Sequence, residues 1–219
     1  MAAKLSLSKG LRWLLDTVQE AGYVDICLDS ADANALKACL PLVKGKVMVN
    51  SINAEKAKME AMLPLFEGYS GKVVGLTMDD RGIPCDVATR VENAEKIVNA
   101  LVARKVKVEE IYLDPLVQPV GTDPNNGRIF LEAIVAINQA IPGIKITCGL
   151  SNISFGLPER KLLNRYFMAL AIGCGLDSAL IDPTDAGMIS AILSAEGLMG
   201  LDQFCIGYLT AFRAGKIKA

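Results

Sequence analysis

The stretch Ile111-Tyr112-Leu113-Asp114-Pro115 indicates the fold of this chain. Its first residues are typical of a buried strand, Asp114 ends the strand with a carboxylate, and Pro115 stops the ladder because it has no backbone N–H. The same order recurs along the chain: a short apolar run, a polar residue at its end, and then a helix-like stretch. The other polar ends are Asp29-Ser30, Asn50-Ser51, Thr77, Ser151-Asn152 and Asp182.

Alternation of short strands with helices predicts a parallel sheet with right-handed crossovers. The helix expected at residues 86–104 shows the helical period in its apolar residues Val91, Ala94, Ile97 and Leu101. We expect strands at residues 24–28, 46–49, 73–76, 111–113, 144–150 and 179–181. We expect helices at residues 8–21, 31–42, 54–67, 86–104, 125–140, 159–173, 184–199 and 201–213.

The number of strands is the main difficulty for a closed barrel. A parallel (β/α)8 barrel needs eight strands and typically about 250 residues. This chain has 219 residues, and nothing before Val24 resembles a strand. We therefore expect residues 1–219 to form a single α/β domain, a TIM (β/α)8-type barrel that lacks its first two strands. The polar strand ends would gather at the C-terminal mouth, where such barrels build their active sites.

The composition argues against a membrane protein or a nucleic-acid-binding protein. Hydrophobic residues make up 52% of the chain and the mean hydropathy is +0.34, which strands buried on both faces explain. The longest uncharged stretch, residues 146–158, is too short to span a bilayer, and residues 1–6 show no signal-peptide core. The net charge of −1 provides no basic face for nucleic acid.

Cysteine and histidine usage bears on the compartment and on metal chemistry. Six cysteines are scattered without a C-x-x-C pair, which favours a reducing cytoplasm over a disulfide framework. The chain has no histidine, so the commonest catalytic base and metal ligand is missing. We predict no metal site.

Polar side chains at the strand ends are the candidate binding residues. Carboxylates such as Asp29 and Asp114 can accept hydrogen bonds from the N–H and amino groups of a guanidine-like ring edge, and the Asn50 amide can donate or accept. The alternative for Asp114 is a carboxylate that caps the next turn. The loop at residues 149–160 carries the strongest signal, because it is long, rich in Gly, Ser and Asn, and places Asn152 at the mouth. Its alternative is an ordinary strand–helix loop.

Several segments occur in the same order in one known family. They include Cys27-Leu28-Asp29-Ser30, Met48-Val49-Asn50-Ser51-Ile52-Asn53, Tyr112-Leu113-Asp114-Pro115-Leu116 and Gly149-Leu150-Ser151-Asn152-Ile153-Ser154, together with residues 75–78, 163–165 and 174–177. Through these segments the chain resembles the pterin-binding methyltransferases that act between methyltetrahydrofolate and a corrinoid protein. The folate domain of cobalamin-dependent methionine synthase belongs to that family. The resemblance extends from Leu11 onward.

The resemblance implies a barrel that holds a pterin at its C-terminal mouth. It implies (methyl)tetrahydrofolate as the substrate, cobalamin carried by a separate corrinoid protein, and a homodimer. It also implies two catalytic residues, Asn152 near the pterin N5 atom and Asp114. The residues that it implies for pterin binding are Asp29, Asn50, Asp114, Asn152, Ser151 and Arg160.

The implied chemistry is a methyl transfer between N5 and cobalt. A hydrogen bond to Asn152 can strengthen as N5 gains positive charge, which stabilises the transition state. No side-chain nucleophile is required, so the missing histidine is no obstacle. The residues do not fix the direction of transfer.

Two alternatives remain open. Family members begin with a strand ending in a Gly-Glu-Arg-Ile-Asn-like motif and a second ending in Asp-x-Asn, and both are missing here, so the chain could be a pterin-binding fragment without activity. Dihydropteroate synthase shares the barrel and a pterin site, but its late-strand lysine and Ser-Arg-Lys-like loop are replaced by Ser151-Asn152.

Overall fold

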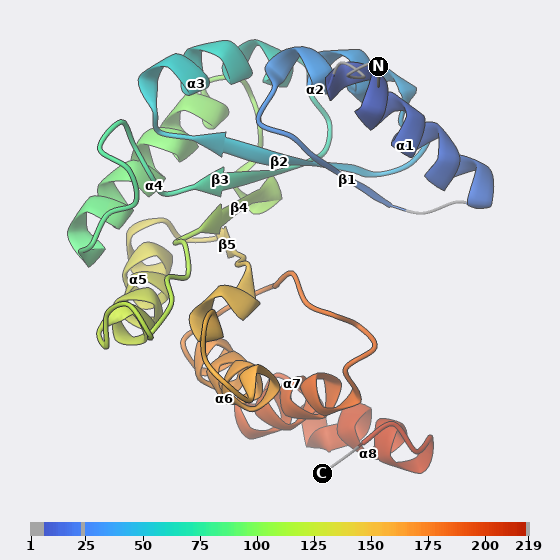
Figure 1. The fold of residues 1–219 in the computed structure, drawn as a ribbon, viewed down its shortest axis with the longest axis vertical. Helices are drawn as coiled ribbons and strands as arrows, with labels where there is room; N and C mark the ends of the chain where they lie inside the picture. The colour runs from blue at the N-terminus through green and yellow to red at the C-terminus, as the bar shows by residue number, and fades with distance from the viewer. Residues whose placement is uncertain (1–6, 23–24, 218–219) are drawn as a thin grey trace.

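Five parallel strands form one sheet in chain order in the computed structural model, which describes residues 7–22 and 25–217 (Figure 1). This confirms the predicted parallel α/β fold. The strands are β1 (Ile26–Asp29), β2 (Val47–Asn53), β3 (Lys72–Leu76), β4 (Ile111–Asp114) and β5 (Lys145–Ile146). The α-helices are α1 (Leu7–Ala21), α2 (Ala33–Cys39), α3 (Lys56–Met62), α4 (Val87–Val102), α5 (Asn126–Ala140), α6 (Arg160–Gly173), α7 (Ala186–Leu198) and α8 (Ile206–Arg213). Short 3-10 helices are η1 (Leu40–Leu42), η2 (Leu63–Phe66), η3 (Val108–Glu110), η4 (Leu150–Ser154) and η5 (Gln203–Cys205).

Helices α1 to α4 lie along one side of the sheet (Figure 1). Alternate strand residues, among them Leu28, Val49 and Leu113, are buried beneath these helices. Gly75 on β3 permits a close approach, because a Cβ atom at this position would lie 2.8 Å from a methyl carbon of Ile97 on α4. The core therefore lies between the sheet and its helical layer.

The predicted site residues on the strands lie on the opposite face of the sheet. Each of Asp29, Asn50 and Asp114 directly follows a buried residue of the helical side, and side chains alternate between the two faces of a strand. Asp29 pairs with Asn50 in the ladder between β1 and β2. Across the sheet, Asp114 pairs with Leu76 in the ladder between β3 and β4.

Two predicted strands are shorter than expected. The strand predicted at residues 144–150 is reduced to Lys145–Ile146. The Thr147 N–H still donates to the Leu113 carbonyl of β4 at 2.9 Å, but the chain then enters η4 at Leu150, and the Ile146 N–H donates to a carboxylate oxygen of Asp177 at 2.8 Å. The strand predicted at residues 179–181 is reduced to a single bridge between Gly149 and Leu180 in the described chain. Val24, the predicted start of the first strand, and residues 1–6 lie outside the described residues.

Three predicted helices are interrupted. The helices predicted at residues 31–42 and 54–67 each change to a 3-10 segment where Pro41 or Pro64 removes a backbone donor. The helix predicted at residues 201–213 begins only at Ile206, because Phe204 and Cys205 have left-handed φ angles of 54° and 55°.

The C-terminal helices form a separate layer. Helices α6 and α7 pack together, and α8 follows at the end of the chain (Figure 1). Large apolar side chains are exposed here, including Leu198 at 87% and Phe204 at 82% of their surface. Within the described ranges no helix has the length and apolar character to cross a membrane. All six cysteines have free thiols.

Candidate functional site

The Asp29 and Asn50 side chains are in direct contact. The Asn50 Nδ2 atom donates to Oδ2 of Asp29 over 3.0 Å, joining the ends of two neighbouring strands. Asp29 is exposed and Asn50 is half-buried. Among the described residues, the Asn50 Oδ1 atom and the second carboxylate oxygen of Asp29 accept no other hydrogen bond, so both are available as acceptors. The pair can therefore recognise the N–H groups at one edge of a heterocycle.

Asp114 ends β4 with a carboxyl group on a half-buried residue. Its Oδ1 atom accepts a hydrogen bond from the Leu116 N–H at 2.7 Å. Burial raises the pKa of Asp114 to about 6, although hydrogen bonds from the Leu116 and Gly149 backbones and the charge of Arg90 act in the opposite direction. One oxygen of the carboxylate, Oδ1, thus caps the turn that follows β4, as the alternative interpretation of Asp114 predicts. A carboxyl with a pKa close to neutrality can also change its protonation state when a ligand binds.

Arg90 is a functional candidate that was not predicted from the sequence. It lies on α4, only 1% exposed, and its guanidinium donates to backbone carbonyls: Nη1 to Pro115 at 2.7 Å and to Leu116 at 3.2 Å, and Nη2 to Pro84 at 3.0 Å. Leu116 has a left-handed φ of 69°, a strained conformation for a residue with a branched side chain. Arg90 therefore holds the turn that directly follows Asp114. The signal in the sequence was a lone arginine on the apolar stripe of the helix.

The loop after β5 places Asn152 at the surface. Asn152 lies in η4 and its backbone N–H donates to the Gly149 carbonyl at 3.3 Å, while its own carbonyl accepts from the Phe155 N–H at 3.1 Å. Its side chain is exposed and forms no hydrogen bond to the part of the chain that is described. The amide is therefore available to a ligand as a donor and as an acceptor.

Arg160 and Ser151, two of the predicted binding residues, are joined by a hydrogen bond to the Ser151 backbone. The Arg160 Nη2 atom donates to the Ser151 carbonyl at 2.7 Å, and its Nε atom donates to the Ser154 hydroxyl at 3.1 Å. The Ser154 hydroxyl in turn donates to Oδ1 of Asn164 on α6 at 2.7 Å. Arg160 therefore fixes η4 against α6, and through η4 it positions Asn152.

The six predicted residues form two groups at one end of the sheet. Asp29 and Asn50 make the first group; Asp114, Ser151, Asn152 and Arg160 make the second, joined through the Gly149 backbone and the Arg160 guanidinium. Asn50 pairs with Val74 on β3, and Asp114 pairs with Leu76 two residues further on. The two groups are thus offset by about 7 Å along the strand direction. No hydrogen bond in the described ranges links one group to the other.

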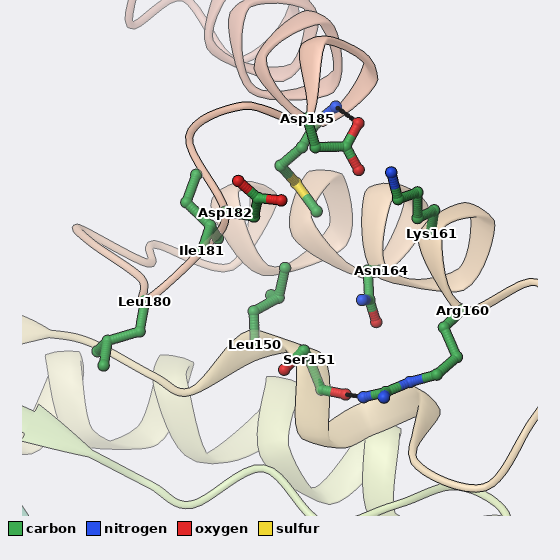
Figure 2. Close-up of a pocket in the computed structure, with 10 residues that line it drawn as sticks. Leu150, Ser151, Arg160, Lys161, Asn164, Leu180, Ile181, Asp182 and Asp185 are labelled. Carbon is green, nitrogen blue, oxygen red and sulfur yellow. Dashed lines mark hydrogen bonds between the residues drawn. The ribbon is translucent and has the colours of Figure 1, made fainter.

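A cavity of about 480 Å³ lies beside the second group (Figure 2). It is bounded by η4, the start of α6, residues 180–182 and the start of α7. Asp29, Asn50 and Asp114 do not line it. The residues that do are Leu150, Ser151, Arg160, Lys161, Asn164, Leu180, Ile181, Asp182, Asp185 and Met188.

A family model described as "Pterin binding enzyme" matches residues 1–182. The chain therefore belongs to the pterin-binding enzyme family, which confirms the resemblance noted in the sequence. One relative, the methylcorrinoid:tetrahydrofolate methyltransferase of Eubacterium limosum, is 41% identical over 211 residues, 95% of this chain and 78% of the relative. The methionine synthases of Mycobacterium leprae and Mycobacterium tuberculosis are each 30% identical over 81% and 88% of this chain, which spans only 16% and 17% of their length.

Solved structures support the fold alone. A dihydropteroate synthase from Coxiella burnetii in complex with pteroic acid matches with a TM-score of 0.67 at 12% identity, over 92% of this chain and 76% of that one. A Yersinia pestis dihydropteroate synthase with a sulfonamide drug matches with a TM-score of 0.64 at 12% identity, over 89% and 73% of the two chains.

Proposed function

We propose that this chain transfers a methyl group between N5 of (methyl)tetrahydrofolate and the cobalt of a corrinoid held by a separate protein. The observation that carries the proposal is the 41% identity to a methylcorrinoid:tetrahydrofolate methyltransferase over 95% of this chain. The polar strand ends support it, because they supply acceptors for the donor-rich edge of a pterin. The reducing compartment and the homodimer predicted from the sequence belong to the same proposal, as does a single domain over residues 1–219.

The strand-end residues bind the pterin ring in this proposal. The Asp29–Asn50 pair and Asp114 accept hydrogen bonds from the ring N–H and amino groups, and the ionised form of Asp114 is the stronger acceptor. Arg90 maintains the Asp114–Leu116 turn from the interior. Binding therefore depends on a carboxyl group whose pKa is raised by burial but which is still mostly ionised above pH 6.

Asn152 is assigned to the reacting nitrogen. Its amide can donate to the N5 lone pair or accept from a protonated N5, so its hydrogen bond strengthens as charge develops on this atom. Such an interaction affects the rate of transfer more than the affinity for the substrate. The cobalt is the partner's group, and the same residues serve transfer in either direction.

Methyl transfer itself tests the proposal. The purified chain is mixed anaerobically with methyltetrahydrofolate and a Co(I) corrinoid, and in the reverse direction with a methylated corrinoid and tetrahydrofolate, while the corrinoid absorbance is followed. Enzyme-dependent loss of the Co(I) spectrum, or its appearance in the reverse reaction, is the expected result. Calorimetry with methyltetrahydrofolate runs in parallel. Binding without transfer to or from any corrinoid carrier would favour the inactive-fragment alternative. Binding of p-aminobenzoate in the calorimeter would favour a dihydropteroate synthase.

A further inference from the structure

We infer that Asp79 is a positioning residue that fixes the spacing of the ring-binding residues, an inference that rests on the proposed function. The Asp29–Asn50 pair and Asp114 are offset along the strand direction and share no hydrogen bond in the described ranges. A rigid ring that contacts both binds more tightly when their spacing is fixed in advance. Because β3 lies between β2 and β4 in the sheet, the loop that leaves β3, residues 77–86, adjoins both strand ends.

The Asp79 carboxylate is the centre of a hydrogen-bond network in this loop. Its Oδ2 atom accepts from Nη2 of Arg81 at 2.7 Å and from Nδ2 of Asn93 on α4 at 3.3 Å, and its Oδ1 atom accepts from the Arg81 N–H at 2.9 Å. The Asp79 side chain is only 12% exposed. Hydrogen bonds from Arg81 are the main cause that holds the pKa of Asp79 well below its ordinary value, so the carboxylate is charged while it accepts these bonds.

On one side the network reaches Asp114. The Nδ2 atom of Asn93 that contacts Asp79 also donates to the Thr77 carbonyl, at 3.3 Å. The Thr77 N–H and hydroxyl both donate to the Asp114 carbonyl, at 3.1 and 3.3 Å. Asn93 and Thr77 have no exposed surface, so water does not replace these bonds. The Asp79 carboxylate therefore holds the backbone of Asp114 through two buried side chains.

On the other side the network holds the loop that follows β2. The Ala54 N–H donates to the Met78 carbonyl at 2.9 Å, and the Lys56 N–H donates to Oδ2 of Asp80 at 3.2 Å. Met78 and Asp80 are the neighbours of Asp79 in the chain, and Ala54 directly follows β2. The turn centred on Asp79 therefore connects the end of β2 to the end of β4 across β3.

Asp86 provides a matched control, because it lies in the same loop and carries the same charge but has a different task. Its carboxylate caps α4 by accepting from the Thr89 N–H at 2.7 Å and from the Thr89 hydroxyl at 2.8 Å. Asp86→Ala should lower the stability of the helix without changing the turn at residues 78–82. A general effect of lost charge or lost stability would therefore appear in both Asp79→Ala and Asp86→Ala.

The test is a double-mutant cycle with Asp114. Isothermal titration with methyltetrahydrofolate measures the effect of Asp79→Ala in the wild type and in Asp114→Asn. We expect the dissociation constant to rise about five-fold in the wild type but less than about two-fold in Asp114→Asn, because the contact that Asp79 positions is already weakened there. Asp86→Ala should leave the dissociation constant unchanged while it lowers the midpoint of urea unfolding.

A second substitution covers the case in which Asp79→Ala does not fold. Asp79→Asn keeps one acceptor oxygen, and its dissociation constant should fall between those of the wild type and Asp79→Ala. Circular dichroism verifies that each variant is folded at the temperature of the titration. If only Asp79→Asn folds, the same cycle with Asp114→Asn is measured with that variant.

The outcomes separate this inference from the proposed function. If the wild type binds methyltetrahydrofolate and the Asp79 variants bind it equally well, Asp79 has no positioning role and the pterin site stands. A loss that persists in full in Asp114→Asn, or that Asp86→Ala shares, would also overturn the inference. If the wild type does not bind methyltetrahydrofolate, the proposed function fails and this inference fails with it.

Discussion

The sheet with its helical layer and the C-terminal helices bury their apolar residues to very different extents. In the first region, Ile97 of α4 and Ile134 of α5 are completely buried. In the second region, α8 buries no residue, and Leu198 and Phe204 expose more than four-fifths of their surface. The first region is a packed core. In the second, α6 and α7 still contribute residues such as Phe167 and Met188 to that core, whereas the end of α7 and α8 form an exposed rim.

This difference separates two tasks within the candidate site. Asp29, Asn50 and Asp114 are held by strands that the core fixes, so their positions depend on packing. Asn152 belongs to the short η4 segment at the border of the two regions, and its position depends on hydrogen bonds from Arg160. The residues assigned to the pterin ring thus lie on strands of the packed region. The residue assigned to the reacting nitrogen lies on a loop that hydrogen bonds hold against that region.

We expect the largest effect on stability from a substitution of Arg90 in the packed region. Arg90→Met removes the guanidinium and leaves the buried Pro115 carbonyl and the partly buried carbonyls of Pro84 and Leu116 without this donor. We expect the free energy of unfolding to fall by about 3 kcal/mol, measured by urea denaturation. Arg128→Met is the control; its exposed ion pair with Glu132 should contribute less than about 1 kcal/mol. Similar losses in both variants would contradict the structural role of Arg90.

A substitution of Asn152 in the η4 loop should mainly change the rate of methyl transfer. Asn152→Ala removes the only amide assigned to N5, and we expect the rate of methyl transfer to fall on the order of 100-fold, as when one transition-state hydrogen bond is lost. The dissociation constant for methyltetrahydrofolate should change by less than about three-fold. Single-turnover kinetics and calorimetry measure the two quantities. Asn99→Ala, at an exposed position on α4, is the control. An equal loss in rate and affinity would assign Asn152 to ring binding instead.

Ionisation of Asp114 should lower the stability of the fold and raise the affinity for the pterin. Folding raises the pKa of Asp114 from 3.8 to about 6, so ionisation is disfavoured in the folded state, and the wild type loses stability as the pH rises through this window. Asp114→Asn lacks this loss and should be more stable than the wild type by about 1–2 kcal/mol at pH 7.5, with little or no advantage at pH 3.5. Thermal unfolding at the two pH values measures it.

The same substitution should weaken pterin binding. In the wild type, affinity should fall below pH 6 as Asp114 becomes protonated, and level off at about ten-fold below its value at pH 7.5. In Asp114→Asn it should be lower by about ten-fold at pH 7.5 and nearly independent of pH, because a charge-assisted hydrogen bond is lost. A wild-type affinity that is flat between pH 5 and 7.5 would rule out the ionised carboxylate as the acceptor.

The sequence was most informative where the structure of a residue is determined by its immediate neighbours in the chain. A β-branched run before Asp29, Asn50 or Asp114 specifies a buried strand, and the polar residue then falls at the C-terminal edge of a parallel sheet. The direct contact between Asp29 and Asn50 also follows from this reasoning, since the two strands are neighbours in the chain and in the sheet.

The sequence was least informative where the outcome depends on distant partners. The strand predicted at residues 144–150 gives way to η4 at Leu150, and Asp177, more than thirty residues away in the chain, accepts from the Ile146 N–H where a neighbouring strand would otherwise do so. The hydrogen bonds from Arg160 to Ser151 and Ser154, which fix η4, were not foreseen in the sequence. Arg90 was overlooked because three carbonyls from two other loops are needed to explain its burial. Only the folded chain brings such partners together.

The smallest expected effect tests the rim region directly. Leu198→Gln keeps good helix propensity and removes a side chain that is 87% exposed, so the free energy of unfolding should change by less than about 0.5 kcal/mol. Ile134→Val removes one methyl group from a fully buried side chain and should cost about 1 kcal/mol. Urea denaturation of both variants at two protein concentrations makes the comparison. If Leu198→Gln proves the more costly variant and its cost depends on concentration, the rim is buried against a second copy of the chain in solution, and the contrast between the two regions holds for one protomer alone.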